Sequence, residues 1–322
     1  MKSNNLYVLW NLTKRHFLVF MKNKIRVLYT LMVPVIVFII YLILLRNLES
    51  QMLINELLKQ GLINSDGTWL FPEMQKDCMT IMDFWMLAGI LGISAITISI
   101  QTNNLLVNDK ENGVNRDFIA SPVNSKVLIS SYFLFNFIVT FMLCFAFFIV
   151  CLIYLAIAGE FILSFLDVLM IVGMLALACI LSTLLTIFIC AFLKHEATLA
   201  SIIAVFSSAV GFLVGAYMPF GLFPDWLQGV CCFIPGTSNV GLLRYGFMSS
   251  SIERFKAYYQ PKMTAQQFDG MMKQIDQFGF NIKFFGQMAT PAVQGCIVAG
   301  SILLFGFLAL IASRFMTRIE DR

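Results

Sequence analysis

The sequence predicts an all-α integral membrane protein with six transmembrane helices, and composition, apolar run length and polar breaks support this prediction. Of the 322 residues, 59% are hydrophobic and 12% are charged, whereas soluble domains carry about a quarter charged residues. The 19 residues from Val27 to Leu45 contain no acidic or basic side chain. As a helix they would extend roughly 28 Å, which matches the hydrocarbon thickness of a bilayer. The short alternating segments of a membrane β-barrel do not occur.

Polar breaks divide the chain into six predicted spans, at about 27–46, 82–106, 127–158, 167–193, 197–218 and 288–313. The third stretch is longer than a bilayer requires, so it should tilt, break near Gly159 or extend beyond the membrane. We therefore expect a 27–313 membrane domain between an N-terminal arm, 1–26, and a short tail, 314–322. An even number of spans places both termini on the same side.

Lysine and arginine orient the predicted bundle. Six lie in the N-terminal arm, three in the 107–126 break, one at Lys194 and three after Ser313. Basic residues in short loops accumulate on the cytoplasmic side, so both termini should be cytoplasmic and the long segments 47–81 and 219–287 external. The net charge of +4 reflects this topology, and we expect no nucleic-acid partner.

Five of the eight cysteines fall inside predicted spans, where they serve as small apolar residues. Only Cys78 and the adjacent pair Cys231 and Cys232 lie outside. A disulfide between Cys78 and this pair stays open, because the sequence does not set the distance between them.

The N-terminal arm carries helical periodicity. As a helix, the arm would place Asn11, Lys14 and Lys22 on one face. The opposite, largely apolar face would hold Leu6, Trp10, Thr13, Phe17 and Phe20. This pattern suits a helix in the membrane interface, with its basic face toward the lipid headgroups. A plain basic tail beside the membrane is the alternative.

The second external segment is the more structured of the two. Pro219, Pro224, Trp226 and Pro235 surround an apolar piece that is too short to span, so we expect a re-entrant or interfacial hairpin. Farther on, Thr264 and Gln267 fit a capping box that starts an amphipathic helix ending near Gly279. The 47–81 segment is too small for an independent domain.

Catalysis finds little support in the sequence. His16 and His195 have no cysteine or carboxylate partner at metal-ligand spacing, and no phosphate-binding glycine loop occurs. Acidic residues are missing from the span centres: Asp83 lies at the edge of the second span, and Glu160 and Asp167 should be solvated turn residues. The chain therefore resembles an externally powered protein more than an ion-coupled one.

Two spans carry packing or pathway signals. Ser94, Thr97, Gln101 and Asn104 form a polar stripe on the second span, which either lines a path or hydrogen-bonds to another helix. Gly211 and Gly215 form a GxxxG pattern in the fifth span. We expect these two helices to meet at a dimer axis, although packing within the subunit accounts for both patterns.

The break between the second and third spans, about 108–122, concentrates charge. Its candidate contact residues for a soluble partner are Asp109, Glu111, Gly113, Arg116, Asp117 and Pro122. The alternative is an ordinary solvated connection.

Two stretches resemble the membrane subunit of type-2 ATP-binding-cassette (ABC) permeases, a family of exporters. One runs from Asp109 through Gly113 to Ser121-Pro122; the other runs from Val214 to Pro219 and continues through Pro224, Trp226 and Pro235 to Arg244. The resemblance covers essentially the whole chain, through its six spans, interfacial helix and external hairpin.

The resemblance implies a half-transporter of the bacterial plasma membrane. A second permease, identical or homologous, would pair with this chain, and separate ABC ATPase subunits would bind ATP and Mg at the cytoplasmic side. The 108–122 segment would be the coupling helix. The cargo would be a drug, antibiotic, peptide or lipid-like molecule, but the long 219–287 segment departs from drug-pump relatives. An ion-coupled transporter and a non-transporting immunity or scaffold protein remain alternatives; a membrane enzyme ranks last.

Overall fold

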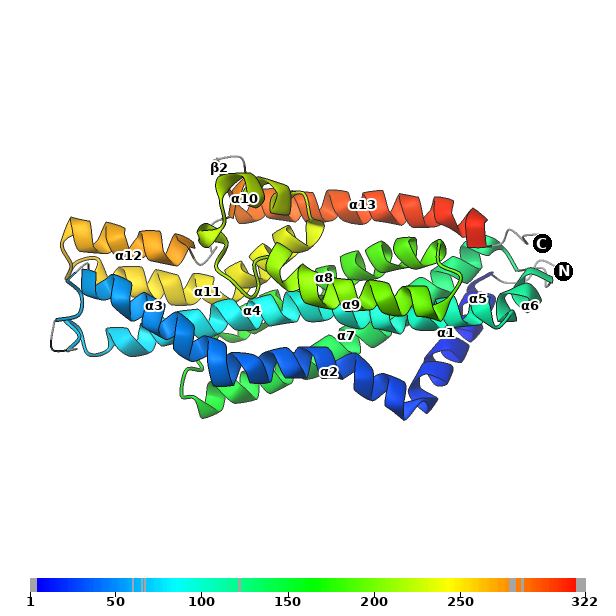
Figure 1. The fold of residues 1–322 in the computed structure, drawn as a ribbon, viewed down its shortest axis with the longest axis horizontal. Helices are drawn as coiled ribbons and strands as arrows, with labels where there is room; N and C mark the ends of the chain where they lie inside the picture. The colour runs from blue at the N-terminus through cyan, green and yellow to red at the C-terminus, as the bar shows by residue number, and fades with distance from the viewer. Residues whose placement is uncertain are drawn as a thin grey trace.

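The computed structural model describes residues 5–59, 61–64, 66, 68–120, 123–277, 282–284 and 287–316. They form an elongated helical bundle in which the start of α1 (Asn5–Lys22) and the end of α13 (Pro291–Met316) lie at the same end (Figure 1). A short antiparallel hairpin of β1 (Ile282–Phe284) and β2 (Gln287–Ala289) precedes α13.

Within the described residues, six helical runs are long and apolar enough to cross a membrane. They are α2–η1–α3 (Lys24–Ile40, Tyr41–Leu45, Arg46–Lys59), α4–α5 (Met74–Thr102, Asn104–Glu111), α7 (Ser125–Ile157), α8 (Phe165–Ala191), α9 (Glu196–Leu213) and most of α13. Each predicted span falls on one of these runs, which confirms the all-helical membrane fold.

The first two runs extend well beyond the predicted spans. The first continues through a π-helical turn to Lys59 rather than ending near residue 46, and the second begins at Met74 rather than residue 82. Loss of apolar character marks where lipid contact ends, but a helix continues until a residue stops it. Gly61 follows α3 with φ +69°, and Leu62 N–H donates to the Leu57 carbonyl at 3.0 Å.

The third run ends at a glycine, one of the three outcomes expected from its length. Gly159 has φ +70°, and Glu160 N–H donates to the Leu155 carbonyl at 3.0 Å. This is the left-handed glycine stop common at helix C-termini.

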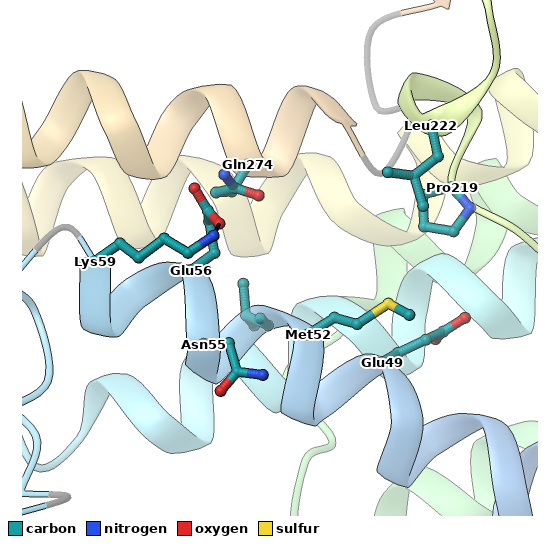
Figure 2. Close-up of a pocket in the computed structure, with 9 residues that line it drawn as sticks. Glu49, Met52, Asn55, Glu56, Lys59, Pro219, Leu222 and Gln274 are labelled. Atoms are coloured by element: carbon teal, nitrogen blue, oxygen red, sulfur yellow. Dashed lines mark hydrogen bonds and ion pairs between the residues drawn. The ribbon is translucent and has the colours of Figure 1, made fainter.

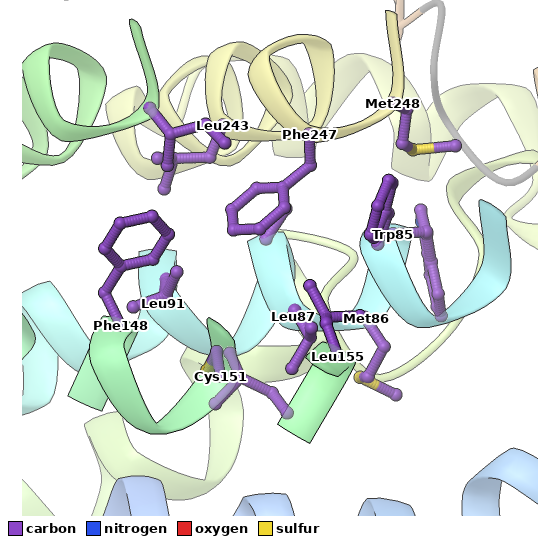
Figure 3. Close-up of a cluster of buried hydrophobic side chains, with 14 of the residues drawn as sticks. Trp85, Met86, Leu87, Leu91, Phe148, Cys151, Leu155, Leu243, Phe247 and Met248 are labelled. Atoms are coloured by element: carbon purple, nitrogen blue, oxygen red, sulfur yellow. The ribbon is translucent and has the colours of Figure 1, made fainter. Parts of the chain in front are cut away.

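Helix α4 forms the centre of the bundle. Its apolar stretch is wholly buried, packed between α7 on one side and α11 (Pro235–Tyr259) on the other (Figure 3). The buried side chains of α4 at this point are Trp85, Met86, Leu87 and Leu91. They pack in one apolar cluster with Phe148, Cys151 and Leu155 of α7 and with Leu243, Phe247 and Met248 of α11. A helix buried on all sides can move only together with the helices around it.

The segment after α9 folds into the short η2 (Phe220–Leu222), α10 (Asp225–Cys232), α11 and α12 (Ala265–Gln277). The predicted capping box is confirmed: Thr264 N–H donates to Gln267 Oε1 at 3.2 Å, and Gln267 N–H donates to Thr264 Oγ1 at 3.3 Å. The predicted stop at Gly279 lies outside the described residues. At the end of the molecule opposite the termini, α12 runs beside α11 and α3 (Figure 1).

All eight cysteines lie in the described part of the chain, and none of them forms a disulfide. Cys78 packs in the main apolar cluster around α4, while Cys231 and Cys232 pack against Phe220. The disulfide left open by the sequence is therefore not formed.

Candidate functional site

The charged break after α4 folds into two short helices rather than one. Helix α5 ends at Glu111, Asn112 and Gly113 turn the chain, and α6 (Val114–Ala120) follows. Gly113 has φ +75°, and a Cβ built there would meet nothing within 4 Å. The left-handed backbone alone accounts for glycine at this turn.

Asp109 is buried inside the chain rather than facing outward. Arg15 of α1 binds it through two nitrogens, with Nη1 to Oδ2 at 2.6 Å and Nη2 to Oδ1 at 3.2 Å. The Tyr132 hydroxyl of α7 donates to Oδ2 at 2.7 Å. Asp109 is 3% exposed, so its side chain joins α1 and α7 to α5 instead of contacting a soluble partner.

His16 completes the contact between α1 and α7. Its Nε2 lies 3.2 Å from Ser131 Oγ, and its Nδ1 lies 3.1 Å from Arg15 Nη1. Because Arg15 can only donate, Nδ1 accepts and Nε2 carries the proton. Burial, together with the Arg15 charge, lowers the pKa of His16 to about 3 although Asp109 opposes this shift. His16 is therefore neutral in the folded protein.

Lys110 binds the C-terminal end of α8. Its Nζ donates to the carbonyls of Cys190, Ala191 and Leu193 at 3.1, 2.6 and 3.3 Å. These carbonyls belong to the last turn of α8 and the residues after it, where helix carbonyls lack partners and the helix dipole favours a cation.

Glu111 binds the adjacent N-terminal end of α9. Its Oε2 accepts from the Glu196 N–H at 2.7 Å, and its Oε1 lies 3.4 Å from His195 Nδ1. Glu196 opens α9, and a helix N-terminus favours an anion. Consecutive residues of α5 thus hold the end of one membrane helix and the beginning of the next.

The remaining predicted contact residues lie on or after α6. Asp117 is exposed, and its neighbour Phe118 lies under the Arg15 guanidinium, 5.2 Å from the ring centre. Arg116 lies in α6, but its side chain is outside the description, as is Pro122. Among the side chains of this segment that the structure describes, the exposed polar ones are Glu111, Asn112 and Asp117.

A family model described as ABC-2 type transporter matches residues 7–248 of this chain. The match includes α1, the α5–α6 segment and the hairpin, and it extends over 242 of 322 residues. The chain belongs to the ABC-2 type transporter family. It is a transmembrane subunit of an ABC transporter and a transport component rather than the catalytic one. No curated protein matches the sequence.

The polar stripe of this ABC-2 subunit divides into two parts. Ser94 and Thr97 are buried and donate to carbonyls of their own helix, Ile90 at 2.6 Å and Ile93 at 3.1 Å. Gln101 and Asn104 are half-buried. The first two residues therefore line no path within the subunit, and the role of the stripe at a dimer interface stays a prediction.

A stronger polar network lies on another face of α4. Ser99 Oγ donates to Asn136 Oδ1 of α7 at 3.0 Å, and Asn103 Nδ2 donates to Thr186 Oγ1 of α8 at 2.7 Å. Thr183 of α8 also donates to Asn136 Oδ1, at 3.1 Å. The i, i+4 spacing of Ser99 and Asn103 is the sequence signal for this face, but the four-residue stripe that begins at Ser94 is the longer polar pattern on the same span.

The two glycines of the GxxxG pattern contact residues of the same chain. A Cβ on Gly211 would lie 2.0 Å from the Tyr217 ring, and one on Gly215 would lie 2.6 Å from the Phe220 ring. Gly215 has φ +66° and follows the end of α9. The pattern therefore shapes the entry to the hairpin, and its role at a dimer axis stays a prediction.

The hairpin residues act mainly as helix boundaries. Pro219 and Pro224 precede η2 and α10, and Pro235 is the first residue of α11. Trp226 is 70% exposed, as an aromatic at a membrane interface would be. Arg244 is fully buried: it stacks on Trp85, 4.9 Å from the ring centre, and donates to the Gly215 carbonyl, so it joins α11 to α4 and to the end of α9.

A pocket of 320 Å³ lies between α3, η2 and α12 (Figure 2), at the end of the bundle opposite α5 and α6 (Figure 1). One part of its wall is apolar, with Met52, Leu53 and Leu222. Another part is polar, with Asn55, Glu56 and Gln274. Its lining suits a ligand with both apolar and polar parts.

The two acids expected to be solvated in the turn after α7 are buried. Asp167 caps α8 by accepting from the Ser164 N–H at 2.9 Å, and it also accepts from the Ser250 hydroxyl at 2.8 Å. Glu160 is 5% exposed. Short turns usually leave acids in water, but here η1 and α3 cover the turn through Arg46, which reaches Glu160 at 3.1 Å.

Proposed function

We propose that this chain is the permease subunit of an ABC exporter. It pairs with a second permease, identical or homologous, and its α5–α6 segment receives a separate ATPase subunit that binds ATP and Mg. The cargo is hydrophobic or amphipathic. The protein lies in the plasma membrane of a bacterium, with both termini in the cytoplasm, as the distribution of lysine and arginine indicates.

The observation that carries this proposal is the pair of contacts made by Lys110 and Glu111. Lys110 holds the end of α8 through three carbonyls, and Glu111 holds the start of α9 through a backbone N–H. A push on the outward surface of α5–α6 is thereby transmitted to two apolar helices at once. Rigid-body motion of this kind is a common route from a local contact to a domain-scale change.

The pocket supports an amphipathic cargo over a free sugar. Its apolar wall would accept a hydrocarbon part, and its polar wall would accept a headgroup. The resemblance to exporters, rather than the pocket, supplies the outward direction.

To test the proposal, the chain is purified in mild detergent from its native host, and the proteins that co-purify are identified. The ATP hydrolysis rate of the purified complex is then measured. Charge reversal at the outward surface, Asp117→Lys, should lower the recovery of a P-loop ATPase and the stimulated hydrolysis by about tenfold, or about 1.4 kcal/mol of lost contact energy. The matched control is Glu253→Lys, an equally exposed acid on α11, which should leave both unchanged.

In the same preparation, Glu111→Gln distinguishes binding of the ATPase from transmission of its motion to α9. The amide keeps an acceptor for the Glu196 N–H but removes the charge at the start of α9. We expect ATPase recovery to stay near wild type while stimulated hydrolysis falls. A preparation that contains the permease at full yield without any ATPase would contradict the proposal and favour the ion-coupled or non-transporting alternatives.

A further inference from the structure

Asp83 of α4 is a fully buried acid with three donors around it. The Tyr41 hydroxyl and Arg46 Nε donate to its Oδ1, Arg46 at 3.1 Å, and the Tyr154 hydroxyl donates to its Oδ2 at 2.8 Å. Tyr41 reaches it from η1, a π-helical turn within an otherwise regular helix. Such turns are frequent at functional sites.

Glu160 is a second buried acid at the same place. Its Oε1 accepts from Arg46 Nη2 at 3.1 Å, but its Oε2 is buried and has no hydrogen-bond partner among the described residues. Asp83 is close enough to act on Glu160 as a hydrogen-bonding neighbour. A proton on Glu160 Oε2 would turn this unpaired acceptor into a donor toward Asp83.

The charges around the pair do not balance when both acids are ionised. Arg46 is shared between Asp83 and Glu160, so one cation faces two anions. The other acidic and basic groups acting on this cluster are Glu49 of α3, a further buried acid that acts on Tyr41, and Lys76 of α4, which acts on Glu160. Two carboxylates that share one site cannot readily both ionise.

We propose that Asp83 and Glu160 form a binding site for one proton at the end of the bundle opposite the chain termini. The bound proton lies on Glu160 and is shared with Asp83. A metal ion suits the site poorly because the Arg46 guanidinium already binds one oxygen of each acid, and the described residues hold no group of three metal-ligating side chains.

Charge and access support the same assignment. Burial and the neighbouring Asp83 raise the pKa of Glu160 to about 8, against the opposing charges of Arg46 and Lys76. The Arg46 side chain is 34% exposed, so water reaches one side of the cluster and can exchange the proton.

Proton release should weaken the folded state. The pKa of Glu160 is higher in the folded protein than its ordinary value of 4.5, so the folded state binds the proton more tightly than the unfolded state. This stabilisation is complete below about pH 4.5 and is lost as the pH rises through about 8. Between these limits each pH unit lowers the folding equilibrium constant by up to tenfold.

Infrared difference spectroscopy of the purified full-length chain tests the site without any ATPase or cargo. Glu49 is a further buried acid whose Oε2 has no hydrogen-bond partner among the described residues, so it would add a carboxyl band of its own, and the measurement is made in a Glu49→Gln chain. This chain should show the carbonyl stretch of one protonated carboxyl at pH 6, lost on alkaline titration with a midpoint near 8. Adding Glu160→Gln should remove the band, because an amide then replaces the carboxyl group.

Thermal unfolding in detergent gives a second readout. The apparent melting temperature of the wild type should fall between pH 6 and pH 9, and Glu160→Gln should flatten this fall. Glu56→Gln, a half-buried acid that pairs only with Lys59 in the described structure, is the matched control and should follow the wild type. Absence of a protonated carboxyl in the Glu49→Gln chain at pH 6, or its survival after Glu160→Gln is added, would overturn the site. Either result would leave the proposed ATPase contact untouched.

Discussion

At the residue scale, Asp109 differs most from its expected role. The sequence placed it among charged groups that face a soluble partner, and its proximity to Glu111 and Asp117 supports that interpretation. Its side chain instead binds Arg15 and Tyr132. The charge thus fixes α1 and α7 to α5, and the link between α1 and α5 is an ion pair.

Asp109→Asn should destabilise the protein by about 2 kcal/mol, because a charged acceptor of three hydrogen bonds becomes a neutral one. This figure is below the cost of breaking a fully buried pair, since Arg15 is 33% exposed and partly screened by water. Thermal unfolding in detergent measures the change, with Asp117→Asn as the exposed control. Equal melting temperatures for the two variants would show that the Arg15 contact contributes nothing.

At the element scale, α4 and α11 depend on one close approach. A Cβ on Gly92 of α4 would lie 2.4 Å from Val240 Cγ2 of α11, a distance that forces one helix to shift. Gly89, one turn earlier, likewise faces Ala216 at 3.1 Å. Gly92 thus allows α11, which carries Arg244, to pack along α4, and Gly89 allows the segment after α9 to approach α4.

Gly92→Ala should therefore cost about 1–3 kcal/mol, the usual range for overpacking a tight contact. The control is Gly300→Ala in α13, where a Cβ would meet nothing within 4 Å; there alanine should be neutral or stabilising by up to about 1 kcal/mol. Unfolding in detergent distinguishes the two. A Gly92→Ala variant as stable as the Gly300→Ala variant would mean that α4 and α11 separate easily.

Several elements could be predicted from the sequence because one local signal determines each of them. Apolar length indicated the six spans, and Thr264 with Gln267 indicated the start of α12. The lengths of α3 and α4 could not be predicted, because both continue past their apolar parts as polar helices held by tertiary contacts. The role of Lys110 was also hidden, since its three carbonyl partners lie about 80 residues away in the chain.

At the scale of the whole molecule, the bundle is longer than a bilayer is thick. The run from Met74 to Glu111 has 38 residues, which corresponds to about 57 Å of helix against roughly 30 Å of hydrocarbon. At the end opposite the termini, α3, α11 and α12 lie side by side (Figure 1). Helices α3 and α12 line the pocket together with η2, so the pocket lies on the side away from α5 and α6.

Asp66, in the turn after α3, and Asn112, in the turn between α5 and α6, should therefore lie on opposite sides of the membrane. Both residues are exposed in the structure. With Cys296, the one exposed cysteine, replaced by Ser, a membrane-impermeant maleimide should label Asp66→Cys in intact cells. Asn112→Cys should react only after permeabilisation, because basic residues keep that side in the cytoplasm. Labelling of both variants in intact cells would contradict the six-span topology, and the reverse pattern would place the termini outside.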